Sequence, residues 1–163
     1  MLTFVQYINE SMNKTLPFVG KRKSGGELQY EYKTNNGRQL LIRYYPMRDS
    51  GHDGYSIQFE VDKVVSMTHH GDPLPIFATV VKNITEVFRT ENPSFLIFGL
   101  EKKRKSIYTK LFKRFGKGKN ISVYVSEMAD MYAMVVINNS SIPDNNINTF
   151  VSHRGSENVT QIL

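Results

Sequence analysis

The sequence contains no cysteine and no tryptophan. The missing cysteine excludes disulfides, thiolate metal ligands and cysteine nucleophiles, and is consistent with a reducing compartment. No stretch approaches the roughly 18 apolar residues of a membrane-spanning helix. The first residues also carry no basic run ahead of an apolar stretch. We therefore expect a cytoplasmic protein without a membrane partner.

Motifs for hydrolysis and metal binding are also missing. The sequence has no Gly-x-Ser-x-Gly, no P-loop and no His-Glu-x-x-His. The metal-like groups are His69-His70 with Asp72, and His52 with Asp53. Adjacent histidines on an extended chain point to opposite sides, and neither group has the spacing of a known site. We predict no metal site.

The composition is that of a globular protein. The chain has 163 residues, of which 40% are hydrophobic and 22% charged. A chain of this length buries roughly 70% of its unfolded surface, which is enough for a core. We predict one domain over residues 1–138. Residues 139–163 form a polar tail rich in Asn and Ser, which we expect to be mobile or to dock.

Periodicity predicts the elements of the first half. Thr3 and Gln6 form a capping-box pattern that opens a helix over 3–13. Alternating residues in 28–33 and 39–45, separated by a turn, predict a β-hairpin, and 55–61 predicts a third strand. The glycines of 20–27 and the turn formers of 46–54 predict loops.

The second half alternates helices and strands. We predict a helix over 75–91 with Pro75 in its first turn, and a central strand over 94–100 that is covered on both faces. A basic helix over 101–115 and strands over 121–126 and 131–138 follow. The predicted fold class is α+β, with a single mixed, mostly antiparallel sheet flanked by helices.

The positive charge is concentrated in one segment. Residues 101–119 hold nine basic residues and one acid, Glu101, for a net charge of +8, whereas the rest of the chain sums to −2. On a helical projection six of the basic residues lie opposite the apolar stripe. Those six residues can be explained as the solvated face of an amphipathic helix. This alternative, in which the segment binds nothing, stays open.

Two features favour a binding site instead. Four cations gather at the N-terminal end of the predicted helix, where the aligned peptides already carry about half a positive charge. Arg104 also projects onto the apolar side, where a guanidinium needs an acceptor. A bound phosphate would resolve both conflicts, and Glu101 is the only local acid expected to offset this charge. The predicted anion-binding residues are Lys102, Lys103, Arg104, Lys105, Lys110, Lys113 and Arg114.

Nucleic acid is the commonest polyanion and is therefore the expected partner; an acidic protein surface is the alternative. Five tyrosines of the strand region offer stacking if they share an exposed face. Such tyrosines are more often part of a core, so we expect most of them to be structural. They are Tyr30, Tyr32, Tyr44, Tyr45 and Tyr55.

The run "SFLIFGL" followed by "KSIYTKLFKRF" resembles the second half of the GNAT acyltransferase fold, and the order of elements over 27–137 is GNAT-like. This resemblance implies acetyl-CoA as cofactor and Tyr108 as the acid that protonates the thiolate. The pyrophosphate loop of that family is not matched in "MTHHGDPLPIFATVV". Gly71 stands alone there, and Pro73 and Pro75 remove two backbone donors.

The opening "MLTFVQYINES", with "FATVV" and "RKSIYTKLFKRF", is also similar to short uncharacterised proteins of tailed bacteriophages. That resemblance implies a location in the host cytoplasm or the virion and implies no activity.

Three hypotheses follow. The first is a non-enzymatic accessory protein that needs no cofactor and binds a phosphate-rich partner through the basic helix. The second is an acyltransferase with an atypical cofactor loop. The third is a virion structural or protein-interaction component, for which an oligomer is possible.

Overall fold

The computed structural model describes residues 3, 6, 10, 12–62, 73–142 and 159–163. At the N-terminus, the backbone N–H of Thr3 donates to Gln6 Oε1 at 2.9 Å, and the N–H of Gln6 donates to Thr3 Oγ1 at 3.2 Å. This reciprocal pair is the predicted capping box. Most of the predicted helix over 3–13 lies outside the described residues.

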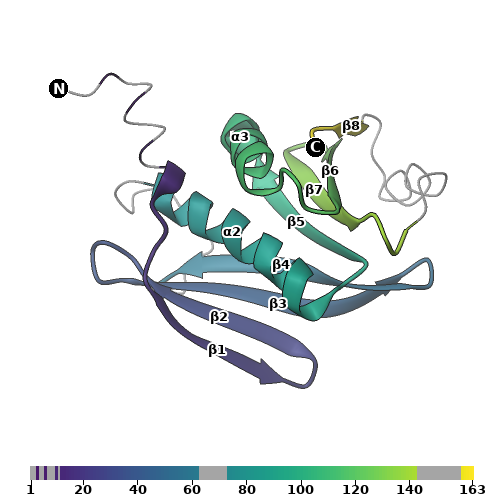
Figure 1. The fold of residues 1–163 in the computed structure, drawn as a ribbon, viewed down its shortest axis with the longest axis horizontal. Helices are drawn as coiled ribbons and strands as arrows, with labels where there is room; N and C mark the ends of the chain where they lie inside the picture. Colours follow the sequence, from purple (N-terminus) through teal and green to yellow (C-terminus); the bar gives the residue numbers. More distant parts are fainter. Residues whose placement is uncertain (1–2, 4–5, 7–9, 11, 63–72, 143–158) are drawn as a thin grey trace.

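The first four strands form an antiparallel meander, seen at the bottom of Figure 1. The predicted hairpin is confirmed by the second and third strands, and the predicted third strand by the fourth. The strands are β1 (Phe18–Ser24), β2 (Glu27–Lys33), β3 (Gln39–Asp49) and β4 (His52–Val61).

Two predicted loops are instead strands. Residues 20–24 belong to β1, which turns into β2 through Gly25 and Gly26, both at positive φ. Residues 46–49 and 52–54 extend β3 and β4, which are joined through Ser50 and Gly51, again at positive φ. A tight turn with two residues at positive φ has the same right-handed twist as the strands on either side of it. The two strands can therefore stay paired up to the turn, where loops were expected.

Helix α2 (Leu74–Glu91) confirms the predicted helix over 75–91 and buries Ile76, Phe77, Val80 and Ile84. It ends at Asn92, whose φ of 49° is left-handed, immediately before Pro93. A proline disfavours helical geometry at the residue before it, which explains the stop.

The rest of the chain follows the predicted order, with the basic helix divided into a short 3-10 turn and an α-helix. These elements are β5 (Phe95–Glu101), η1 (Lys102–Arg104), α3 (Lys105–Phe115), β6 (Ile121–Glu127), β7 (Met131–Asn138) and β8 (Val159–Gln161).

The eight strands of the described residues belong to one sheet, in the order β1-β2-β3-β4-β5-β7-β6-β8. β4 and β5 are parallel and pair over Gly54 to Ser56 with Phe95 to Ile97, whereas the other neighbours are antiparallel. The predicted α+β class, with one mixed and mostly antiparallel sheet and flanking helices, is therefore confirmed.

The main core lies between the sheet and both helices, which lie side by side across it (Figure 1). A smaller cluster of Phe95, Tyr124, Val135, Ile137 and Ile142 covers the other face of β5, β6 and β7. Residues Phe95 and Leu96 are both fully buried and point to opposite faces. β5 is thus the predicted central strand.

The described end of the tail docks on the sheet. The N–H of Val123 donates to the Leu163 carbonyl at 2.9 Å, and Ile162 N–H donates to the Val123 carbonyl at 2.8 Å. Ile162 and Leu163 pack against the main core. This segment covers the edge of β6, and residues 143–158 lie outside the described part.

Candidate anion-binding surface

The four cations at residues 102–105 were predicted to lie together at the N-terminus of an α-helix, but only Lys105 belongs to that helix. Residues 102–104 form the 3-10 turn η1, and α3 begins only at Lys105. Glu101 precedes η1 in extended conformation, with φ −65° and ψ 143°. The change of direction after β5 sends the first cations toward different neighbours.

Two acids form ion pairs with three of these cations. Glu101 Oε2 lies 3.2 Å from Lys103 Nζ, and Glu101 Oε1 lies 3.6 Å from Arg104 Nη2. Glu127, at the end of β6, lies 3.3 Å from Lys102 Nζ. The expectation that Glu101 would be the only compensating acid is wrong, because strand pairing brings Glu127 to the same place.

Arg104 is held by the protein itself. Its side chain is only 12% exposed, and its guanidinium lies 5.2 Å from the centre of the Phe77 ring, in addition to the ion pair with Glu101. The projection of Arg104 onto the apolar side was correct. At this position the Glu101 carboxylate lies within ion-pair distance of the guanidinium.

Two cations, Lys102 and Lys105, lie over the ring of Tyr132 on β7. Lys105 Nζ lies 5.0 Å from the centre of its ring, and Lys102 Nζ lies 5.8 Å from it. A cation over an aromatic face gains about 0.5–1 kcal/mol at an exposed site. The ion pairs and the Tyr132 ring therefore relieve part of the charge conflict at the start of α3 within the molecule.

The outer face of α3 keeps its charge unpaired. Lys110, Lys113 and Arg114 are exposed and have i, i+3 and i+4 spacing, so they lie together on one face of the helix. The opposite face buries Tyr108, Leu111 and Phe112. Lys117 and Lys119 follow in the exposed turn after the helix. None of these five cations forms an ion pair with a carboxylate of the described residues. We call Lys110, Lys113, Arg114, Lys117 and Lys119 the α3 basic surface.

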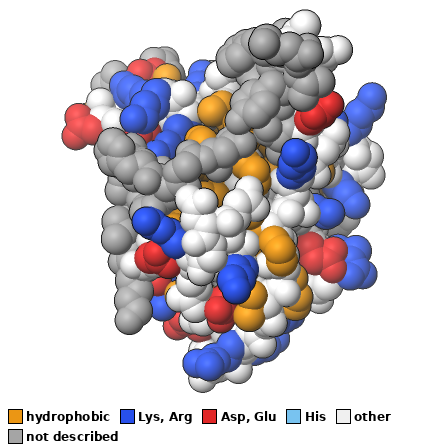
Figure 2. All heavy atoms as spheres, turned by 90° about the vertical axis from the view of Figure 1, so that its left-hand side faces the viewer, with side chains coloured by type: hydrophobic (Ala, Val, Ile, Leu, Met, Phe, Trp, Pro, Cys, Tyr) orange, Lys and Arg blue, Asp and Glu red, His pale blue; other side chains and the backbone are white. Residues whose placement is uncertain are grey.

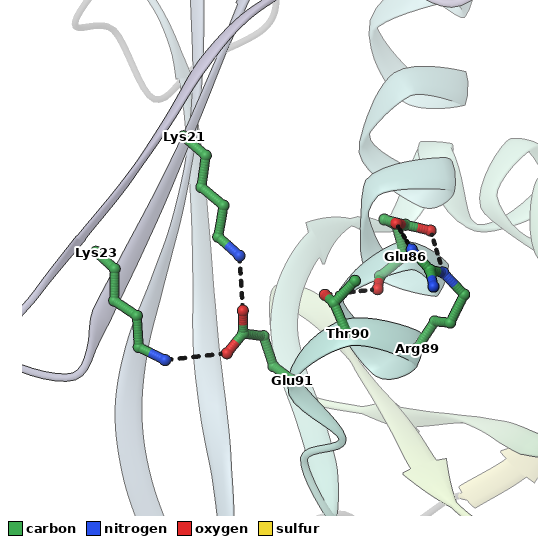
Figure 3. Close-up of polar contacts among 6 residues, drawn as sticks. All are labelled: Lys21, Lys23, Glu86, Arg89, Thr90 and Glu91. Atoms are coloured by element: carbon green, nitrogen blue, oxygen red, sulfur yellow. Dashed lines mark hydrogen bonds and ion pairs between the residues drawn. The ribbon is translucent and has the colours of Figure 1, made fainter.

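Charge elsewhere is more evenly mixed. Figure 2 shows a face of the molecule on which Lys and Arg side chains lie interspersed with Asp and Glu. On β1, Lys21 and Lys23 both contact Glu91 at the end of α2, at 2.6 and 3.2 Å (Figure 3). These two lysines lie in a segment that was predicted to be a loop, and they instead fix an edge strand to a helix end.

The strand tyrosines are mostly structural, as predicted. Tyr30 and Tyr44 are buried, and their rings meet edge to face with centres 5.7 Å apart. Tyr32 and Tyr55 are half-buried against the main core. No exposed row of tyrosines for stacking is formed by the described strands.

A separate cavity of about 550 Å³ opens where β4 and β5 diverge beyond their short parallel contact. Its lining includes Phe59, Leu100, Arg104 and Tyr108. The Tyr108 hydroxyl is fully buried and has no hydrogen-bond partner among the described groups. Burial raises the pKa of Tyr108 well above its ordinary value of 10.0, with a small opposing effect of Arg104, so this phenol is neutral.

Metal ligation finds no support in the described part of the chain. It contains no group of three or more His, Cys, Asp or Glu side chains that could hold an ion. His69, His70 and Asp72 lie outside the described residues. Among the described helices, none is both long and apolar enough to cross a membrane.

Comparison of the sequence with protein-family models gives no match, and comparison with curated proteins gives none either.

Proposed function

We propose that the protein is a non-enzymatic accessory protein that binds nucleic acid through the phosphate backbone, and that the α3 basic surface makes the contact. The observation that carries the proposal is the concentration, on one helix and the turn after it, of five exposed cations that form no ion pair with a described carboxylate. Such an arrangement attracts a polyanion and leaves the cations available for phosphates.

The centre of the proposed site lies on the outer face of α3 and not at residues 102–105, where the sequence predicted it. Lys102, Lys103 and Arg104 already hold carboxylates, so an anion would have to compete with Glu101 and Glu127 for them. Lys105 lies over Tyr132. These four residues supply longer-range attraction, whereas Lys110, Lys113 and Arg114 contact phosphate directly.

The experiment compares two double variants that remove the same charge. Lys110→Ala with Lys113→Ala removes two unpaired lysines, and Lys102→Ala with Lys103→Ala removes two paired ones. Binding of a labelled 20-nucleotide DNA strand is measured by fluorescence anisotropy between about 50 and 200 mM salt.

We expect the first variant to lose about tenfold in affinity at low salt and to flatten the salt dependence by about 1.4 log units per log unit, as expected for two phosphate contacts on a single strand. The second variant should lose at most about threefold. Equal losses in both variants, or wild-type binding that does not weaken with salt, would overturn the proposal.

One observation favours a second candidate, the acyltransferase. Tyr108 lines the cavity between β4 and β5, and its buried hydroxyl has no hydrogen-bond partner among the described groups, so the neutral phenol is uncommitted as a proton donor. Against this candidate, the start of α2 lacks two backbone donors for a pyrophosphate: α2 follows Pro73 without a side-chain cap, and Pro75 lies in its first turn. Neither proline has a backbone N–H to donate. Calorimetry decides: no heat with acetyl-CoA at millimolar concentration eliminates this candidate.

A further inference from the structure

A cavity of about 390 Å³ lies at the C-terminal end of α3, between that helix, α2 and the segment that enters β1. Its size is at the lower end of the range for small-molecule sites. The lining residues that matter here are Phe18, Tyr32, Lys82, Asn83, Phe115 and Lys119. Lys119 belongs to the α3 basic surface, and Phe115 directly follows Arg114, so the cavity and that surface adjoin.

Aromatic side chains form one wall of this cavity. Phe18 is 58% exposed, and its ring meets that of Tyr32 edge to face with centres 5.5 Å apart. Phe115, at the end of α3, contributes a half-buried ring to the lining. Exposed aromatic faces are the usual surfaces on which unpaired bases stack.

The charge at the cavity is positive. Lys82 and Lys119 are exposed, and neither forms an ion pair with a described carboxylate. Glu86 also lines the cavity, but both its oxygens face Arg89, with Oε1 at 2.5 Å from Nη2 and Oε2 at 3.0 Å from Nε (Figure 3). The hydrogen bonds from Arg89 are the main cause that lowers the pKa of Glu86, with burial opposing them and the charges of Arg89, Lys119 and Lys21 adding smaller contributions, so most of its charge is compensated by Arg89.

A buried amide supplies hydrogen-bonding capacity. Asn83 is 3% exposed and lines the cavity. Its Oδ1 accepts from the Tyr44 hydroxyl at 2.6 Å, and its Nδ2 donates to the Tyr32 hydroxyl at 3.0 Å. An amide has two N–H donors and a phenol has one O–H. One donor on Asn83 and the O–H of Tyr32 therefore remain for the carbonyl oxygen or ring nitrogen of a base.

We propose that this cavity binds one unpaired nucleobase, with Phe18 and Phe115 beside the ring and Lys119 and Lys82 on the flanking phosphates. The inference rests on the proposed function and makes it more specific: the preferred ligand is a single strand and not a duplex. The same chemistry would suit a free mononucleotide, so the experiment must separate the two sources.

Phe18→Leu is the central variant, because it keeps an apolar side chain at an exposed position and removes the aromatic face. Arg48→Gln is the control, since Arg48 is 72% exposed on the β3–β4 hairpin and does not line this cavity. A thermal melt monitored by circular dichroism checks that both variants fold. Anisotropy is measured with a labelled dT12 strand, with a 12-base-pair duplex and with AMP as competitor.

We expect wild type and Arg48→Gln to bind dT12 at least tenfold more tightly than the duplex at equal salt, and Phe18→Leu to lose about tenfold on dT12 alone. Salt-sensitive binding without strand preference, or with a preference unchanged in Phe18→Leu, would overturn the cavity inference and leave the proposed function standing.

A failure of the proposed function would give a different experimental result from a failure of the cavity inference. If neither dT12 nor the duplex binds, the proposed function is wrong, and direct titration of AMP followed by tyrosine fluorescence then decides on the cavity. Saturable binding of AMP that Phe18→Leu abolishes supports a free-nucleotide site, and no binding of AMP overturns the cavity inference as well.

Discussion

The hydroxyl of Tyr44, buried beneath α2, donates a hydrogen bond of 2.6 Å to Oδ1 of Asn83 on that helix. This bond joins the sheet to α2 in the main core, where both side chains are almost inaccessible to water. Burial raises the pKa of Tyr44 well above its ordinary value of 10.0, so the phenol is neutral and available as the donor.

Tyr44→Phe should lower the free energy of unfolding by about 1–3 kcal/mol, because Asn83 Oδ1 loses its hydrogen-bond donor while remaining buried. Urea unfolding followed by fluorescence measures the change. Tyr55→Phe is the control on the neighbouring strand: Tyr55 is half-buried, and its change should stay within about 0.5 kcal/mol. Equal effects of the two substitutions would show that the Tyr44 hydroxyl contributes nothing specific.

Tyr108→Phe should have the opposite sign. Tyr108 is as fully buried as Tyr44, but its hydroxyl has no partner among the described groups, so removing it relieves a desolvation cost without breaking a bond. We expect stability to rise by up to about 1 kcal/mol in the same urea experiment. A clear loss of stability would mean that this hydroxyl is engaged after all, and would weaken its assignment as an uncommitted acid.

Gly54 marks the place where the parallel pair of β4 and β5 forms. A Cβ built at Gly54 would lie 2.7 Å from Phe95 Cδ1 and would also strike the Phe95 carbonyl oxygen. Because Phe95 is fully buried and fixed in the central strand, it cannot give way. Gly54→Ala should therefore cost at least about 1–3 kcal/mol of stability.

Gly20→Ala provides the matched comparison. Gly20 also lies in a strand, and a Cβ there meets no atom within 4 Å. Its thermal midpoint should stay close to that of wild type, whereas that of Gly54→Ala should fall by several degrees. If both variants melt alike, the close approach of β4 and β5 does not limit stability.

The sequence predicted the elements whose signals are local. The apolar stripe and the flanking prolines located α2, and alternation located β2 and most of β4. It failed at 20–27 and 46–54, because glycine-rich turns there continue hairpins, and only the pairing of β1 with β2 and of β3 with β4 distinguishes the two outcomes.

The candidate site was predictable in composition but not in geometry. The basic face of α3 follows from helical spacing, whereas the neutralisation of Lys102 depends on Glu127, 25 residues away on another strand. The cavity likewise combines Phe18, Lys82 and Lys119, which are brought together only by the packing of β1, α2 and the end of α3. The exposure of Phe18 on an edge strand, which points to this cavity, is visible only in the fold.

Glu91 makes stability depend on pH in the acid range. It lies at the C-terminal end of α2, where a carboxylate is unfavourable, and Lys21 and Lys23 compensate it (Figure 3). The hydrogen bond from Lys21 is the main cause that lowers the pKa of Glu91 below its ordinary value of 4.5, with burial opposing it and Lys23 adding to it. A lowered pKa in the folded state stabilises the protein above the unfolded-state pKa, and this contribution is lost as pH falls through 4.5 toward the folded-state pKa.

Glu91→Gln removes this titration. We expect wild type to lose about 0.5–1 kcal/mol more stability than Glu91→Gln between pH 6 and pH 3, a magnitude that allows for the solvent exposure of the two lysines. Urea midpoints at pH 6, 5, 4 and 3 measure the difference. Asp130→Asn is the control, because Asp130 is exposed and has no ion pair with the described residues; it should follow wild type. Parallel pH curves for wild type and Glu91→Gln would show that the lysines of β1 do not favour the ionised form of Glu91 in the folded protein.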